Sequence, residues 1–419
     1  RASVFRQDGY TFDAGPTIIT APYLFEELWT LCGRRMADDV DVRPVNPFYV
    51  VRFDDGTEVR YSDDADDMRR QLGGHRSVYG KVSNFFRDER LRILFSFHPL
   101  LIGGNPFTTT SFYCLISHLE RRFGVHYAMG GMGSLVNGLA GLVRGHGNAI
   151  RCNAEVAEIL VRDGRAAGVR LADGERLPAD VVVSNADPAW TYGKLLANHP
   201  RRRWTDTKLA GASYSMSLFV WYFGTNRRWE DVRHHTMVLG PRYKGLLDDI
   251  FGRKKLAEDF SLYLHRPSAT DPSLAPPGCD SFYVLSPVPH LQSGTDWAAT
   301  AEAYRARVER RLAETVLPGL AGSIVSSRVM TPQDFRDRLL SVNGAAFAME
   351  PRLLQSAWFR PHNLSEELPG LYIVGAGTHP GAGLPGVLSS AKIVDELLAA
   401  GAHGSRREVL QQARGAEPA

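Results

Sequence analysis

The residues best suited to chemistry lie in a glycine-rich stretch near the end of the chain, LYIVGAGTHPGAGLPGVLSSAK, residues 371–392. Its loop contains five glycines: Gly375, Gly377, Gly381, Gly383 and Gly386. Because glycine has no side chain, backbone N–H groups there can approach a bound anion or cofactor closely. The spacing is not GxGxxG and no Walker lysine is present, which excludes a standard phosphate loop. The pattern fits a cofactor loop, and it also fits a tight corner that binds nothing.

The elements around this loop are a strand and a helix. The apolar run 371–374 is bounded by glycines and predicts a buried strand. Residues 387–400 follow a helical rhythm of apolar positions. A strand, a glycine loop and a helix in this order direct free backbone N–H groups toward a ligand.

Two further stretches combine glycine with a change of direction. Asp13-Ala-Gly15-Pro16 interrupts the second of two predicted strands, since Gly15 permits close backbone approach and Pro16 stops strand pairing. Gly130-Gly-Met-Gly-Ser134 opens a predicted helix, residues 135–146, which again suits close approach of a cofactor or substrate. A plain structural turn is an equally good interpretation of the first stretch.

No nucleophile–base order, metal-ligand spacing or carboxylate pair stands out. The four cysteines are scattered and form no CxxC pair, which argues against a metal site and suits a reducing cytoplasm. We expect no metal and assign no catalytic residue. Residues that could act as a base by type alone are Asp13, His98, His234, His235 and His379.

Length and composition exclude several classes of protein. A chain of 419 residues has room for two or three interleaved lobes. A net charge of +3 on this length does not suggest nucleic-acid binding. No run of 18 apolar residues occurs, so no transmembrane helix is expected.

Other segments have clear local patterns. Residues 45–61 predict a hairpin around Asp-Asp-Gly-Thr, with strands at 48–53 and 58–61. Residues 149–185 predict a β-meander whose strands begin at Ala149, Val156, Ala166 and Ala179. Residues 213–224 and 281–288 read as long strands. Residues 297–316 predict an amphipathic helix with Ala303, Val308, Leu312 and Val316 facing inward.

Residues 93–127 are rich in apolar and aromatic side chains, are interrupted by Gly-Gly-Asn-Pro and contain Arg121 and Arg122. An apolar helix with basic and aromatic flanks can lie in a membrane interface. A buried helical pair gives the same pattern, so both interpretations stay open.

The glycine-rich stretch resembles the C-terminal flavin motif of the bacterial and fungal type phytoene desaturases, which are FAD-dependent carotenoid desaturases within the amine-oxidase-like flavoproteins. Three other stretches, residues 10–20, 234–291 and 331–363, are similar to the same family. The similarity covers almost the whole chain in order, and motifs of this length are far more specific than a lone glycine pattern.

The resemblance implies an α/β fold in which a three-layer, Rossmann-like FAD-binding domain is interleaved with a β-sheet substrate domain and an apolar helical membrane-facing region. The implied FAD-binding domain comprises residues 1–22, 130–190 and 362–400. Residues 23–64 and 191–361 form the implied substrate-binding domain, residues 65–129 the membrane-facing region and residues 401–419 a disordered tail.

The resemblance also implies which residues contact FAD. They are Arg1, Gly15, Pro16, Val156, Asn185, Gly375, Gly377, Gly386 and Val387. Members of the family begin with a strand and a GxGxxG loop that ends in Gly-Gly-Arg, and Arg1 corresponds to that arginine. We therefore expect the natural protein to carry this segment before Arg1.

The implied activity is the FAD-dependent desaturation of phytoene to neurosporene- or lycopene-type carotenes. Implied partners are a long polyene substrate and a membrane surface, with a cytoplasmic, peripherally membrane-associated location. Two alternatives remain: a related carotenoid enzyme, such as a diapocarotene desaturase, a late-carotene desaturase or a ketolase-like relative, and a truncated fragment that binds lipid without catalysis.

Overall fold

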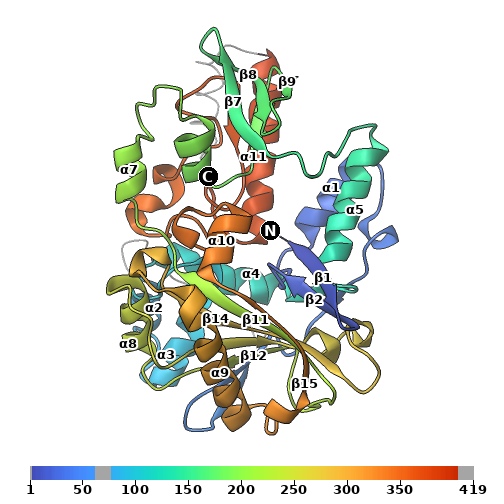
Figure 1. Ribbon diagram of the computed structural model, residues 1–419, viewed down its shortest axis with the longest axis vertical. Coiled ribbons are helices and arrows are strands. Elements are labelled where there is room, and N and C mark those ends of the chain that lie inside the picture. The colour runs from blue at the N-terminus through green and yellow to red at the C-terminus, as the bar shows by residue number, and fades with distance from the viewer. Residues whose placement is uncertain (1, 62–76, 404–419) are drawn as a thin grey trace. The chain divides into compact units, whose positions relative to one another are not determined.

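The computed structural model describes residues 2–61 and 77–403, which form two compact units (Figure 1). The first unit comprises residues 1–150 and 214–353, and the second comprises residues 151–213 and 354–419. Arg1 lies outside the described residues, as does most of the tail for which we expected disorder. The first three residues of that tail, 401–403, belong instead to the last helix, α11 (Leu384–His403).

A mixed sheet forms the centre of the first unit, with the strand order β15-β11-β14-β13-β12-β4-β5. Its strands are β4 (Tyr49–Arg52), β5 (Glu58–Tyr61), β11 (Ser217–Thr225), β12 (His235–Val238), β13 (Leu262–His265), β14 (Asp280–Val288) and β15 (Ile324–Met330). The parallel pair is β4 with β12, and the other neighbouring strands are antiparallel. The predicted hairpin within residues 45–61 and both predicted long strands are confirmed, apart from shifts at the strand ends.

Both faces of this sheet are covered, because all nine residues of β11 are buried. One face packs against helix α9 (Trp297–Thr315), which begins where the Asp296 carboxylate accepts hydrogen bonds from the backbone N–H groups of Ala298 and Ala299. A strand covered on both sides carries an unbroken apolar run instead of alternating with polar residues, which is the pattern of β11.

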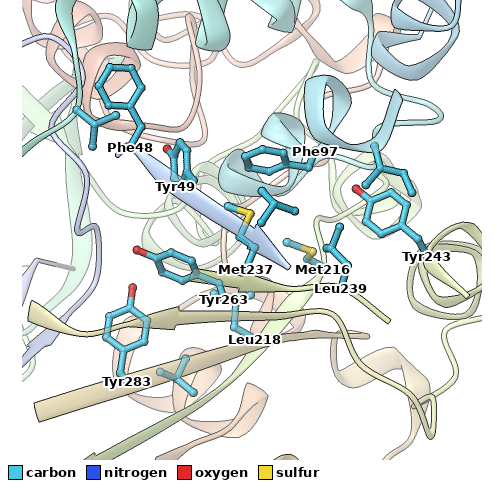
Figure 2. Close-up of a cluster of buried hydrophobic side chains, with 14 of the residues drawn as sticks. Phe48, Tyr49, Phe97, Met216, Leu218, Met237, Leu239, Tyr243, Tyr263 and Tyr283 are labelled. Atoms are coloured by element: carbon cyan, nitrogen blue, oxygen red, sulfur yellow. The ribbon is translucent and has the colours of Figure 1, made fainter. Parts of the chain in front are cut away.

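The opposite face of the sheet carries tyrosine, histidine and methionine. Tyr49, Met237, Tyr263 and Tyr283 belong to the buried cluster on this face, and Phe97 approaches them from a helical segment (Figure 2). The strand register places His235 opposite His265 and Met237 opposite Tyr263, so these side chains share one face.

Helices and two small ribbons complete the first unit. The ribbons pair β1 (Ser3–Gln7) with β2 (Tyr10–Ala14) and β3 (Val42–Pro44) with β6 (His126–Ala128). The helices are α1 (Tyr23–Leu31), α2 (Val78–Val82), α3 (Glu89–Ser96), α4 (Leu115–Phe123), α5 (Met132–Gly145), α8 (Tyr243–Leu247) and α10 (Pro332–Leu339).

The second unit holds two small sheets. One is antiparallel and consists of β7 (Val156–Arg162), β8 (Arg165–Leu171) and β9 (Arg176–Pro178). The other pairs β10 (Val182–Ser184) with β16 (Leu371–Ile373) in parallel. Its helices are α6 (Pro188–Trp190), α7 (Asp206–Gly211) and α11.

Three local predictions were wrong. The strand expected to begin at Ala149 is absent from the described structure, and β10 spans only the last three residues of the run that begins at Ala179. In α9 the inward position is Tyr304, which is buried, whereas Ala303 is exposed. The Tyr304 hydroxyl lies 2.8 Å from Ser286 Oγ on the sheet, so an aromatic residue with a polar tip fits this position better than alanine does.

The domain boundaries implied by the resemblance stay predictions. The glycine loop, Asn185 and Val156 belong to the second unit, whereas Gly15 and residues 130–150 belong to the first.

A buried ion pair fixes the end of the central sheet. Arg266 Nε lies 2.8 Å from Asp280 Oδ2, and both side chains are almost fully inaccessible to solvent. Asp280 also accepts hydrogen bonds from the Trp229 backbone N–H and from Ser268 Oγ, and Arg266 donates to the Val232 carbonyl. Breaking one half of such a pair leaves a buried charge without compensation.

We expect Arg266→Met to lower the free energy of unfolding by roughly 3–5 kcal/mol, because Asp280 would keep its buried charge and lose its cation. Denaturant unfolding followed by circular dichroism would measure the loss. The matched control is Arg228→Met, because Arg228 is partly exposed and lies 4.0 Å from Asp280. That change should cost under about 1 kcal/mol. Equal losses in the two variants would contradict this account of the pair.

Candidate functional site

The glycine loop begins where two parallel strands end. In the second unit Ser184 of β10 pairs with Ile373 of β16, and the Val374 N–H continues the ladder to the Ser184 carbonyl. Asn185 and Gly375 therefore follow the carboxyl ends of adjacent strands. Ligands of open α/β sheets bind at this edge.

Gly375 cannot be replaced without rearrangement. Its φ is +99°, a conformation that favours glycine, and an added Cβ would overlap Asn185 Oδ1. The structure thus brings two of the predicted cofactor residues, Asn185 and Gly375, into direct contact.

Residues 360–363 hold the glycine loop in place through hydrogen bonds. The buried Arg360 guanidinium donates to the Ala376 carbonyl at 2.7 Å, and the Asn363 amide donates to the His379 carbonyl at 3.0 Å. Thr378 Oγ1 donates in turn to the Pro361 carbonyl. Sequence reasoning included this stretch in the resemblance but gave it no role at the site, because only the fold shows which carbonyls these side chains reach.

A single hydroxyl joins the loop to helix α11. Ser390 Oγ accepts a hydrogen bond from the Gly375 N–H at 2.8 Å and donates to the Val387 carbonyl at 2.6 Å. Gly386 packs on the loop itself, since a Cβ there would lie 2.6 Å from the Gly381 carbonyl oxygen. The first turn of α11 is half-buried, and helix starts carry partial positive charge and N–H groups without intrahelical partners.

The remaining predicted cofactor residues lie elsewhere. Gly377 is buried within the loop, and Val156 opens β7 in the antiparallel sheet of the second unit. Gly15, with φ of +128°, and Pro16 follow β2 in the first unit. Arg1 lies outside the described residues.

Asp13 organises the corner beside Gly15. Its carboxylate accepts hydrogen bonds from the Met132 backbone N–H at 2.7 Å and from the Tyr127 hydroxyl at 2.9 Å. Asp13 thereby satisfies the amino end of helix α5, and an added Cβ at Gly131 would lie only 2.5 Å from Asp13 Oδ1. Gly131 therefore makes room for a carboxylate of this chain. Burial raises the pKa of Asp13 to about 6, against the lowering effect of these two hydrogen bonds.

Three histidines and two tyrosines form a buried network on the aromatic face of the sheet. His234 Nε2 lies 3.0 Å from His265 Nε2, and His235 Nδ1 lies 2.7 Å from the Tyr263 hydroxyl. Thr17 Oγ1 links the hydroxyls of Tyr263 and Tyr283 at 3.0 and 3.4 Å.

Burial keeps this network uncharged. It lowers the pKa of His234 to about 3, and it also holds the pKa values of His235 and His265 well below the usual value for histidine. Burial raises the pKa values of Tyr263 and Tyr283. At neutral pH the rings on this face are therefore neutral imidazoles and protonated phenols.

The imidazole nitrogens of the three histidines lie within 4.8 Å of one another, a spacing that could hold a metal ion. Metal-ligand spacing did not stand out in the sequence, because His265 is distant from the other two along the chain. A divalent cation placed here would be buried beside neutral ligands only, which is costly without a compensating carboxylate or thiolate. His234 Nδ1 also lies 2.5 Å from Thr270 Oγ1. With the contacts described above, four of the six ring nitrogens have a hydrogen-bond partner, so a neutral network explains the geometry better.

The two units, with this glycine loop, match known proteins. The family model described as flavin containing amine oxidoreductase matches residues 58–394. A neurosporene-forming phytoene desaturase of Cereibacter sphaeroides is 49% identical, with 97% of this chain and 89% of that protein covered. A lycopene-forming phytoene desaturase of Pseudescherichia vulneris is 46% identical, with 95% and 91% covered. The chain belongs to the flavin-containing amine oxidoreductase family and, within it, to the bacterial phytoene desaturases.

The fold is also that of a solved structure. An oxidoreductase from Methanosarcina mazei superposes with a TM-score of 0.68 at 17% identity, covering 94% of this chain and 91% of that one. The predicted α/β flavoprotein fold class is confirmed.

The alignment with the Cereibacter protein runs over 463 residues, more than this chain of 419 residues can fill. That relative therefore has residues within the aligned range to which nothing in this chain corresponds.

The residues of the second unit fit a flavin, the cofactor of this family. The loop has no room for a Cβ at Gly375, and a half-buried helix start with its N–H groups follows it. Backbone donors at a helix start suit the electron-rich edge or the phosphates of such a group. Which of these residues contact FAD stays a prediction.

We expect Gly375→Ala to abolish or strongly reduce flavin retention, because the new Cβ would displace Asn185 and strain a backbone with positive φ. The flavin content of the purified protein would be measured by absorbance after denaturation. Gly211→Ala is the matched control, because a Cβ at Gly211 would meet open space in the same unit. Equal flavin content in both variants would remove the loop from the cofactor site.

Asp13 should also make stability depend on pH. Folding raises its pKa from 3.8 to about 6, so its favourable contribution is complete below pH 3.8 and is lost as pH rises through 6. Asn at this position cannot titrate. The free energy of unfolding of the wild type minus that of Asp13→Asn should therefore fall by roughly 2–3 kcal/mol between about pH 4 and about pH 7.

Denaturant unfolding at a series of pH values would measure this difference. Asp55→Asn serves as a control of opposite sign, because hydrogen bonds from Thr57 lower the pKa of Asp55. Its contribution is lost as pH falls. A flat difference curve for Asp13→Asn would show that the Asp13 pKa does not change on folding.

Proposed function

We propose that this protein desaturates phytoene, using FAD, to carotenes of the neurosporene or lycopene type. The observation that carries the proposal is the identity of 46–49% to relatives with this activity, over almost the whole length of both chains. The glycine loop of the second unit supports it, because its geometry suits the cofactor that such a reaction needs.

We assign the flavin to the edge formed by Asn185, Gly375, Gly377, Gly386 and Val387. Val156 of the second unit, Gly15 and Pro16 of the first unit, and Arg1, which lies outside the described residues, are proposed as further FAD contacts on the family resemblance alone. The chain's backbone N–H groups hold and orient the cofactor in this proposal, and Arg360 and Asn363 keep the loop in shape. When bound, the flavin supplies the acceptor for the hydride that leaves the substrate.

We assign the polyene to the aromatic face of the first unit's sheet. Removing hydrogens from adjacent carbons develops positive charge along the polyene, and tyrosine ring faces stabilise positive charge. Tyr222, Tyr263 and Tyr283 lie on this face, all buried. The neutral histidines add polarity without charge, which suits a hydrocarbon. No catalytic base is assigned.

The substrate determines where the enzyme works. A hydrocarbon of about forty carbons gains on the order of 30 kcal/mol on leaving water, at ~0.8 kcal/mol per CH₂. It therefore resides in a bilayer. Among the described residues, no helix combines the length and apolarity needed to cross a membrane. We propose that the protein works in the cytoplasm, bound peripherally to a membrane.

A protein that binds lipid without catalysis is the alternative from another class. It is kept because the aligned relative has residues to which nothing in this chain corresponds. A desaturase of diapocarotenes or late carotenes is the alternative within the same class, and only the products separate these enzymes.

Expression in a host that accumulates phytoene should convert it to coloured carotenes, which chromatography of the pigments would identify. The gene is best expressed with any coding sequence that precedes Arg1. Three added double bonds would give neurosporene and four would give lycopene, so the identity of the product gives the number of desaturation steps.

Two negative results would be informative. Unchanged phytoene with flavin bound to the purified protein would overturn the phytoene assignment in favour of another carotenoid. Unchanged phytoene without bound flavin would favour the lipid-binding alternative.

A further inference from the structure

Helix α4 and the short 3₁₀ helix η4 (Ser111–Cys114) before it carry an apolar stripe that points away from the protein. Phe112 and Leu115 are 53% and 54% exposed, and Ile116 and Leu119 are partly exposed. These four residues follow the i, i+3, i+4, i+7 spacing, so they share one side of the helical segment. We call them the docking face.

The buried side of α4 is polar, which reverses the usual arrangement. The residues of α4 that are buried are Ser117 and Glu120. Glu120 Oε1 accepts a hydrogen bond from the Tyr49 hydroxyl at 2.6 Å, and Glu120 Oε2 lies 3.1 Å from His98 Nε2. A helix on a water-soluble surface normally buries its apolar stripe and exposes its polar side. The Glu120 contacts instead hold α4 with its polar side inward, and this rotation turns the docking face outward.

Basic residues lie at the end of the same helix. Arg121 and Arg122 occupy the last turn of α4, and His118 and Arg122 are exposed. The rings of Tyr23 and Phe123 contact each other at 4.8 Å between centroids, tilted by 46°, which adds an aromatic pair beside these arginines. Long basic side chains next to apolar ones suit an interface where acyl chains meet anionic headgroups.

We propose that the docking face inserts into the acyl region of a bilayer while Arg121 and Arg122 contact anionic lipid headgroups. The inference rests on the proposed function in one respect: a substrate dissolved in the bilayer requires the enzyme to reach acyl chains. A second copy of the chain fits less well, because a two-fold interface would bring the same arginines of α4 close together.

Sedimentation with vesicles of phosphatidylcholine and phosphatidylglycerol tests the proposal on the full-length protein. The variant Phe112→Asp/Leu115→Asp should bind at least about tenfold more weakly than the wild type, because two carboxylates would enter the apolar layer. The matched control is Leu354→Asp/Trp358→Asp, which alters another exposed apolar pair, 71% and 60% exposed, in the second unit. That variant should bind as the wild type does.

A reversed result, in which only the control variant loses binding, would overturn the proposal, as would unchanged binding of both variants. Light scattering without lipid would measure the oligomeric state. If the docking-face variant changed from dimer to monomer and kept its vesicle affinity, the face would bind a second copy of the chain instead of a bilayer. Lower unfolding stability with unchanged vesicle binding would show that the chain itself covers the face.

The outcome is independent of catalysis, because the vesicles contain no carotenoid. Vesicle binding through this face without pigment formation would contradict the proposed function alone. Turnover of phytoene by a protein that binds vesicles equally with and without the docking-face substitutions would contradict this inference alone.

Discussion

Burial of the inner strands of the central sheet is the constraint on which the first unit depends. Every residue of β11 is buried, so neither face of the sheet can be left to water at this strand. Helix α9 covers one face with apolar contacts. The other face buries an unusual number of polar rings, and each of these must find a partner inside the protein or cost free energy. Many of the other segments of the first unit supply these partners.

The partners come from distant parts of the sequence. Thr17 reaches Tyr263 and Tyr283, Asp13 reaches Tyr127, and Glu120 reaches Tyr49. These bonds also fix the corner beside Gly15, the start of α5 and the rotation of α4, which are segments with separate roles. The hydrogen bonds that satisfy buried polar groups therefore also orient these functional segments.

Local patterns in the sequence predicted the elements whose structure depends on residues that are neighbours along the chain. The strand before Gly375, the hairpin around Asp54 to Thr57 and the helix from Trp297 are all marked by turn residues, caps or apolar runs. The family resemblance added the cofactor and the order of the segments. Which of the residues in these segments contact FAD stays a prediction.

Features set by distant contacts were not predicted. Arg360 and Asn363 brace the loop through backbone carbonyls that no pattern could identify. The outward apolar face of α4 has the same periodicity as an inward one, and only the position of Glu120 reveals its direction. The expected strand at Ala149 failed for a related reason: a run with strand propensity needs a partner strand, and none pairs with it in the described residues.

Ser390 is a position where a single side-chain oxygen restricts which residues the fold can accept. Its hydroxyl is fully occupied, accepting from the Gly375 N–H and donating to the Val387 carbonyl, within a side chain that has no solvent exposure. Alanine and cysteine fill similar space but would weaken or remove both bonds, and larger polar residues have no room in a close-packed interior. Among the twenty amino acids few alternatives to serine therefore remain at this helix position, which makes one side chain of α11 part of the loop's own structure.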